Sequence, residues 1–204
     1  MDAQEGHELL IMRTRGFSLV ELMVAVALLA LLLGLSTPSF TTWVRNAQTR
    51  TASDALQNGL RLAQAEAIRR HRQMVFFLTN DPVCSNATQP AEAGSFWVLR
   101  SVALVAGDPV DTVQCGQLSE VAAGVAIAGP TALCFSGAGR QAANADPGIG
   151  TTACTLPVSG SSQYDLSNPH GDRRLRVVVA LAGSVRMCDP ARILSADQPD
   201  GCRA

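Results

Sequence analysis

Residues 17–37 read FSLVELMVAVALLALLLGLST and form a dense apolar block near the N-terminus. About twenty apolar residues are enough for a helix to cross the hydrocarbon core of a bilayer. Arg13 and Arg15 come just before the block, and positive charge keeps that end of a membrane helix in the cytoplasm. We therefore expect a transmembrane helix over about 17–38, with the rest of the chain outside the cytoplasm.

One carboxylate, that of Glu21, interrupts the apolar block. A charged side chain at the centre of a membrane helix costs about 2.5–3.5 kcal/mol on insertion scales, so such a residue normally has a partner within the membrane. The expected partner is a positive charge on another subunit or on the new amino terminus of this chain. The alternative is a glutamate that snorkels from the helix end to the membrane surface.

An ordinary secretory signal is the competing interpretation of this N-terminus. Such a signal places its small-residue cleavage site after the apolar region, whereas Gly16 comes before it here. Ser36 or Thr37 would be the nearest substitutes for a signal peptidase site. Because the small residue precedes the block, we expect the apolar helix to stay on the mature product.

Residues 15–21, RGFSLVE, resemble the type IV prepilin processing site. The resemblance implies that a membrane aspartyl peptidase, the prepilin peptidase, removes residues 1–16 and N-methylates Phe17 after cutting behind Gly16. It also implies that Glu21 pairs with the amino terminus of a neighbouring subunit and sets the axial register of a filament. Met1 and Met12 both remain possible start sites.

Pro38 falls where many members of that family carry a helix-bending proline. A proline removes one backbone donor and disturbs the preceding turn, so we expect a kink or a melted turn at this position.

Beyond the apolar block the helix should continue to Arg72, because residues 43–72 contain no proline and one glycine. Apolar residues recur there at spacings of three and four, which places them on one helix face. That face should pack on a sheet. Its members are Ala52, Leu56, Leu60, Ala63 and Ala67.

Short runs of strand-forming residues follow the helix. We expect strands at 74–79, 96–102, 121–127, 133–136, 174–180 and 184–188, a loop over 141–162 and an irregular tail over 189–204. One long helix, 17–72, packed on a small antiparallel sheet domain, 73–204, is an α+β fold.

This order of elements resembles the soluble half of the GspH/FimT family of minor pilins and pseudopilins. The resemblance covers most of residues 16–188, including an aromatic-x-x-x-Gly strand end from Phe135 to Gly139 and an arginine-rich C-terminal hairpin. It implies a structural subunit anchored in inner-membrane lipid, with its sheet domain in the periplasm. Its partners would be other pilins or pseudopilins of a type IV pilus or a type II secretion system, whose assembly it would prime or cap.

Six cysteines follow the apolar block: Cys84, Cys115, Cys134, Cys154, Cys188 and Cys202. No pair has the CxxC spacing of a zinc or redox site, and an even number of scattered cysteines in an exported domain predicts disulfides. Several connectivities are possible. Pairing sequence neighbours (84–115, 134–154 and 188–202) closes the shortest loops and is our prediction, with free buried thiols as the alternative.

Catalytic chemistry has no visible support in the sequence. The three histidines are His7, His71 and His170, and none of them belongs to a Ser–His–Asp, HExxH or phosphate-loop pattern. We therefore expect no enzymatic activity, no metal and no cofactor.

DNA capture is a further hypothesis, because some members of the family resemble DNA-uptake pilins that hold DNA through a C-terminal Gly-Arg-x-Arg motif. Residues 183–186 read GSVR, so serine replaces the first arginine of that motif. Clustered arginines can still contact phosphates. We favour a charged, solvated edge strand, because the motif is broken and the chain without residues 1–16 is formally neutral. The candidate arginines are Arg173, Arg174, Arg176 and Arg186.

Overall fold

The computed structural model describes residues 18–203 except 106, 109 and 119–123, and it describes residues 35–39 by their backbone alone. The chain divides into two units, Met1–Phe40 and Thr41–Ala204. The expected α+β fold is confirmed, with one long helix and ten strands among the described residues.

Helix α1 runs from Leu19 to Arg70, two residues short of the expected end. It ends because His71 adopts a left-handed φ of 51°. The His71 N–H then donates to the carbonyl oxygen of Ile68 (3.2 Å), and the Arg72 N–H donates to that of Ala67 (3.3 Å). This pair of bonds is the Schellman pattern, which satisfies carbonyl groups that a helix end leaves open.

The first sheet holds five strands in the order β3-β2-β1-β5-β6, and all of its pairs are antiparallel. Its strands are β1 (Met74–Thr79), β2 (Phe96–Ser101), β3 (Thr112–Gln117), β5 (Ala132–Phe135) and β6 (Gln141–Ala142).

The second sheet also holds five strands, in the order β10-β9-β8-β7-β4. Its pairs are antiparallel except that β10 runs parallel to β9. Its strands are β4 (Ala126–Ala128), β7 (Ser161–Ser167), β8 (Leu175–Ala180), β9 (Val185–Ile193) and β10 (Gly201–Cys202).

Several expected boundaries were wrong in these sheets. The span 141–162 is not only a loop, because it contains β6 and the start of β7. The tail is not wholly irregular, because β9 extends to Ile193 and pairs with β10. We did not predict β3. Residues 121–123 of the strand expected at 121–127 lie outside the described residues, and within the rest of that span only Ala126 and Ile127 belong to a strand, β4. Strands β3 (TVQCGQ) and β6 (QA) have little apolar content and form by pairing with their neighbours, which a sequence pattern does not report.

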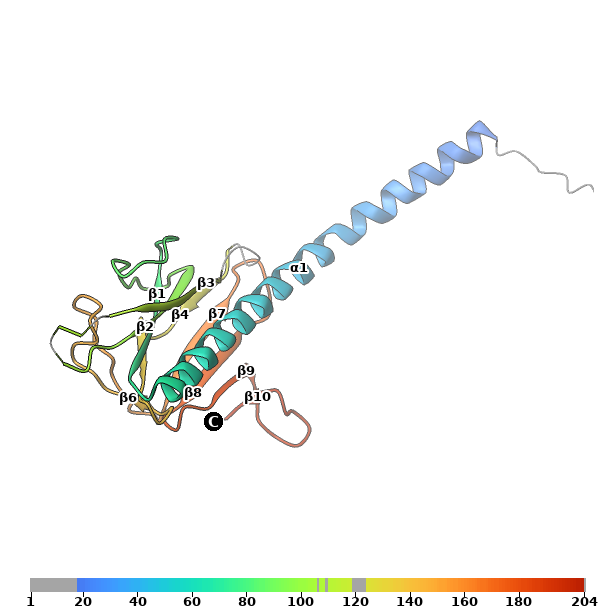
Figure 1. Cartoon of the computed structure of the whole chain (residues 1–204). Helices are drawn as coiled ribbons and strands as arrows, with labels where there is room; N and C mark the ends of the chain where they lie inside the picture. The colour runs from blue at the N-terminus through green and yellow to red at the C-terminus, as the bar shows by residue number, and fades with distance from the viewer. Residues whose placement is uncertain (1–17, 106, 109, 119–123, 204) are drawn as a thin grey trace, which may run out of the picture. The chain divides into compact units, whose positions relative to one another are not determined.

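The main core lies between α1 and the inward faces of both sheets (Figure 1). The predicted apolar helix face is confirmed, since Leu56 and Leu60 are completely buried. Phe76 of β1 and Trp97 of β2 stack there with ring centroids 5.6 Å apart. Burial of this one helix face fixes residues 41–70 of α1 on the sheets.

A second, smaller core covers the opposite face of the first sheet. It contains Val75, Phe77 and Val98 from the strands and Ile149 from the loop after β6. All six cysteines are paired, and the disulfides join the neighbours in sequence: Cys84–Cys115, Cys134–Cys154 and Cys188–Cys202. The first two tie loops to this sheet, which lets it bury both of its faces.

Candidate functional site

The helix start brings together two residues of the predicted processing region. The backbone N–H of Glu21 donates to Oγ of Ser18 (3.2 Å), and the Leu22 N–H donates to the Ser18 carbonyl oxygen (3.1 Å). Ser18 therefore caps α1, with Glu21 at the third helical position, the Ser-x-x-Glu spacing of a capping box. A carboxylate in the first turn also suits the positive end of the helix dipole. Glu21 thus stabilises the helix start whatever else it binds.

The first turns of α1 present apolar side chains on all sides. Their exposed fractions lie between 53% and 74% for Leu19, Val20, Leu22, Met23, Val24, Val26, Leu28, Leu29, Leu31, Leu32 and Leu33. A helix that is apolar all round is stable when lipid or other protein surrounds it. This segment therefore requires an apolar environment.

Within the described part of the chain, no helix has a stretch that is both long and apolar enough to span a membrane. The expected span over 17–38 includes Phe17 and the side chains of residues 35–38, which lie outside the described residues, as does Gly16. The backbone stays helical through Pro38, without a melted turn. A proline removes one donor only, and the kink there stays a prediction.

The four candidate arginines of the basic patch do not line one surface. Arg173 lines a groove of about 460 Å³ between α1 and the β8–β9 pair, where its Nη2 lies 4.0 Å from Oδ2 of Asp189. Arg176 and Arg186 line a different groove of about 510 Å³. Arg174 is exposed and lines neither. The patch expected from the sequence is therefore divided.

Contacts within the chain also reduce the charge of this region. Arg176 of β8 pairs with Asp165, its cross-strand neighbour on β7, through Nε–Oδ1 (2.6 Å) and Nη2–Oδ2 (3.1 Å). Arg186 donates from Nη2 to the carbonyl oxygen of Gly201 (3.1 Å). A bidentate carboxylate pair satisfies much of a guanidinium group, so Arg176 contributes little net charge.

A buried arginine that we did not single out from the sequence organises the loop after β1. Arg100 of β2 is 1% exposed, and burial lowers the pKa of its guanidinium. Its Nη2 donates to the carbonyl oxygens of Ser85 and Thr88 (3.0 Å each), and its Cζ lies 5.1 Å from the ring centroid of Phe77. The available signal was one arginine in the otherwise apolar run FWVLRS.

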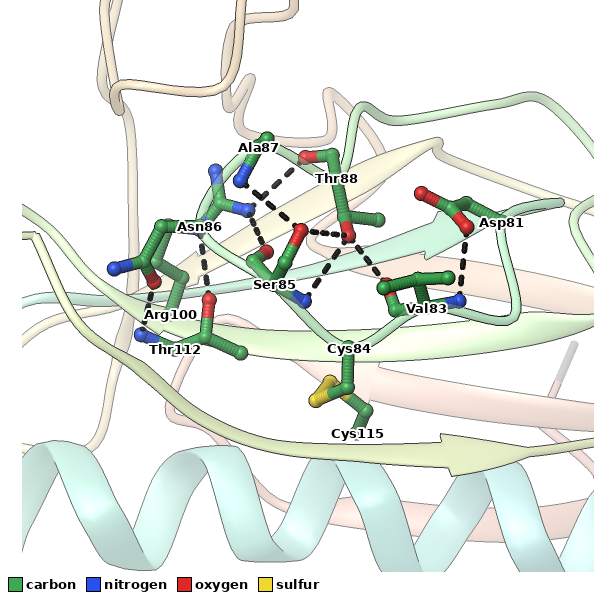
Figure 2. Close-up of a disulfide and its surroundings, with 10 residues drawn as sticks. All are labelled: Asp81, Val83, Cys84, Ser85, Asn86, Ala87, Thr88, Arg100, Thr112 and Cys115. Carbon is green, nitrogen blue, oxygen red and sulfur yellow. Dashed lines mark hydrogen bonds between the residues drawn. A yellow bond between two sulfur atoms is a disulfide. The ribbon is translucent and has the colours of Figure 1, made fainter.

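Figure 2 shows that this loop is tied to strand β3 at two points. The Cys84–Cys115 disulfide ties it to β3, and the Asn86 Oδ1 accepts the backbone N–H of Thr112 (2.8 Å) on the same strand. The loop is therefore a built part of the domain, fixed by the disulfide, by Asn86 and by Arg100.

The histidines occupy structural positions. His71 forms the C-terminal turn of α1, and the His170 N–H donates to Oδ1 of Asn168 (3.0 Å). His7 lies outside the described residues. In the described ranges, no three His, Cys, Asp or Glu side chains are grouped so that they could hold a metal ion.

Two family models match the chain. The prokaryotic N-terminal methylation motif matches residues 11–37, and the type II transport protein GspH matches residues 52–183, more than half of the chain. No curated protein sequence matches.

Solved structures of similar fold come from three bacterial species. The type IV minor pilin FimU of Pseudomonas aeruginosa is 14% identical with a TM-score of 0.49, over 78% of this chain and 98% of that one. The minor pseudopilin EpsH of the Vibrio cholerae type 2 secretion system is 14% identical with a TM-score of 0.44, over 71% and 99%. GspH of Escherichia coli is 10% identical with a TM-score of 0.44, over 72% and 91%.

Proposed function

This chain belongs to the GspH family of type II transport proteins, and we propose that it is built as a minor subunit into a filament assembled at the bacterial inner membrane. The filament is a type IV pilus or its counterpart in a type II secretion system, since both machines use subunits of this kind. The observation that carries the proposal is the methylation motif at 11–37, because it coincides with the start of an apolar, exposed helix.

Processing after Gly16 prepares the helix for assembly. The cut would make Phe17 the first residue, one position before Ser18, which caps α1. A positive group at the positive end of the helix dipole is unfavourable. A carboxylate from a neighbouring subunit offsets that cost, and Glu21 is the carboxylate available in the first turn. This pairing sets the axial register between subunits.

The apolar segment of α1 has two successive environments in this account. Before assembly, inner-membrane lipid surrounds it, and after assembly the helices of other pilins or pseudopilins do so. The sheet domain lies in the periplasm, an oxidising compartment in which disulfides form and persist. All six cysteines being paired supports that location. As a minor subunit, the chain primes or caps the filament rather than forming its length.

Cross-linking tests the assembly role in the full-length chain. A photo-reactive residue at the exposed position Leu28 is combined with Glu21→Ala or with Glu92→Ala, which removes an exposed carboxylate from the sheet domain. In cells that hold the other filament subunits, we expect Glu21→Ala to lose the cross-links to pilins while its leader is still removed. Glu92→Ala should keep them. Equal cross-link yields in both variants would show that Glu21 does not set the register.

A further inference from the structure

The outer face of the second sheet carries a polar groove to which α1 contributes no residue. The groove has a volume of about 510 Å³ and lies over β7, β8, β9 and the end of the chain. Among the described residues, three guanidinium groups line it, those of Arg176, Arg186 and Arg203, and no acidic side chain does. Asp165 offsets the charge of Arg176, so Arg186 and Arg203 are the two groove arginines that no side-chain carboxylate of the described residues faces within the lining.

Contacts within the domain hold Arg186 and Arg203 in place at the groove. Arg186 is fixed by its bond to the carbonyl oxygen of Gly201 (3.1 Å) and keeps further N–H donors, since a guanidinium has five. Arg203 follows Cys202 directly, and the Cys188–Cys202 disulfide ties Cys202 to β9. The disulfide therefore brings the C-terminal arginine to the rim of the groove.

The remaining lining adds neutral polar groups to the charge. Ser161 and Gln163 project from β7, and Ser184 lies at the β8–β9 turn. Hydroxyl and amide groups beside guanidinium forks suit a ligand that carries both an anionic group and hydroxyls. The volume falls in the range of small-molecule sites. Arg173 and Arg174 lie outside the groove, so the positive charge forms a local pocket rather than a strip along the surface.

We propose that this groove binds a small organic anion, such as an acidic sugar or a phosphorylated sugar, whose carboxylate or phosphate group contacts Arg186 and Arg203. This site stands apart from the proposed filament function, which rests on α1.

Titration of the full-length protein in a neutral detergent tests the site. The probes are inorganic phosphate and D-glucuronate, which separate the two anionic groups, and D-glucose is the uncharged control. The side-chain Nε–H signals of the arginines are followed by NMR. We expect saturable shifts of Arg186 and Arg203 with at least one anion and none with glucose. The double variant Arg186→Gln/Arg203→Gln should weaken binding by roughly tenfold or more.

Arg174→Gln is the matched control, because it removes an exposed arginine of the same hairpin that does not line the groove. It should change affinity by less than about twofold. The single variant Arg203→Gln keeps the bond between Arg186 and Gly201. Weaker binding by this variant therefore reports a lost ligand contact and not a loosened tail. Absence of saturable binding with both anions, equal weakening by Arg174→Gln, or binding of duplex DNA without either small anion would overturn the proposal.

Discussion

Gly183, in the turn between β8 and β9, lies against the carbonyl oxygen of Gly139, so closely that a Cβ atom at position 183 would overlap that oxygen. Both glycines have positive φ, 94° at Gly183 and 74° at Gly139. Gln64 of α1 donates from Nε2 to the same oxygen (2.9 Å). One carbonyl group therefore joins the helix to turns of both sheets, and these are the glycines of the two motifs noted in the sequence.

The first prediction concerns this junction. Gly183→Ala should lower the free energy of unfolding by about 2–4 kcal/mol, for two reasons. Alanine is strained at a left-handed φ, and its Cβ would overlap the backbone carbonyl of Gly139. Gly148→Ala is the matched control, since Gly148 has a φ of 78° and nothing within 4 Å of an added Cβ. It should cost about 1 kcal/mol from strain alone. Urea unfolding followed by circular dichroism measures both, and equal losses would refute the close approach.

Arg100 provides the second prediction. Arg100→Met removes the donor to the carbonyl oxygens of Ser85 and Thr88, and a buried acceptor without a partner costs about 1–3 kcal/mol. Amide hydrogen exchange should therefore become faster across residues 83–89. Arg192→Met, which removes an exposed arginine paired with Asp200, should leave that loop unchanged. Unaltered protection of the loop in Arg100→Met would mean that the Cys84–Cys115 disulfide and Asn86 hold it without Arg100.

Third, the disulfides should differ in their effect on stability. Cys134 and Cys154 lie in the second core, whereas Cys188–Cys202 ties down the C-terminal tail. Replacing either pair by alanine removes a constraint worth about 3 kcal/mol for loops of this length. Loss of the Cys134–Cys154 pair should lower the melting temperature further, because it also exposes core. Calorimetry measures the melting temperature of both double variants. A larger drop on loss of the Cys188–Cys202 pair would contradict the expected order.

The fourth prediction is a pH dependence at the end of α1. Hydrogen bonds from Arg69 and then Arg70 lower the pKa of Glu66 from its usual 4.5 to about 2. A carboxylate with a lowered pKa stabilises the folded state above pH 4.5, and this contribution disappears as the pH falls towards 2. Glu66→Gln should therefore be less stable than the native chain at neutral pH, with the difference closing near pH 2. Thermal melts between pH 2 and 7 measure it, with Glu92→Gln as the control, and a difference that is constant with pH would contradict the lowered pKa.

The elements that the sequence predicted well are those with a periodic apolar pattern. Leu56 and Leu60 recur with the helical period and are buried as expected, and β1 has the expected bounds because its residues are nearly all apolar. Strand β7 reads SSQYDLS, and only Ser162, Tyr164 and Leu166 face inward, so its apolar content is too small to stand out. Strand β9 contains Pro190, which normally argues against a strand.

The surface sites were less predictable, since they depend on which residues meet in space. Arg173 and Arg176 are close in sequence but line different grooves. Arg203 comes to the same groove as Arg186 because the Cys188–Cys202 disulfide and the pairing of β10 with β9 hold the tail there. By contrast, Glu21 stood out in the sequence because a carboxylate within an apolar run is unusual at any position.

The mature N-terminus is the feature on which the whole account rests. Mass spectrometry of the N-terminal peptide, from protein produced together with a prepilin peptidase, identifies it directly. We expect the chain to begin at Phe17 with one added methyl group, and Gly16→Ala to retain residues 1–16. A mature chain that begins after Ser36 or Thr37, or one that keeps its leader beside an active peptidase, would contradict the account.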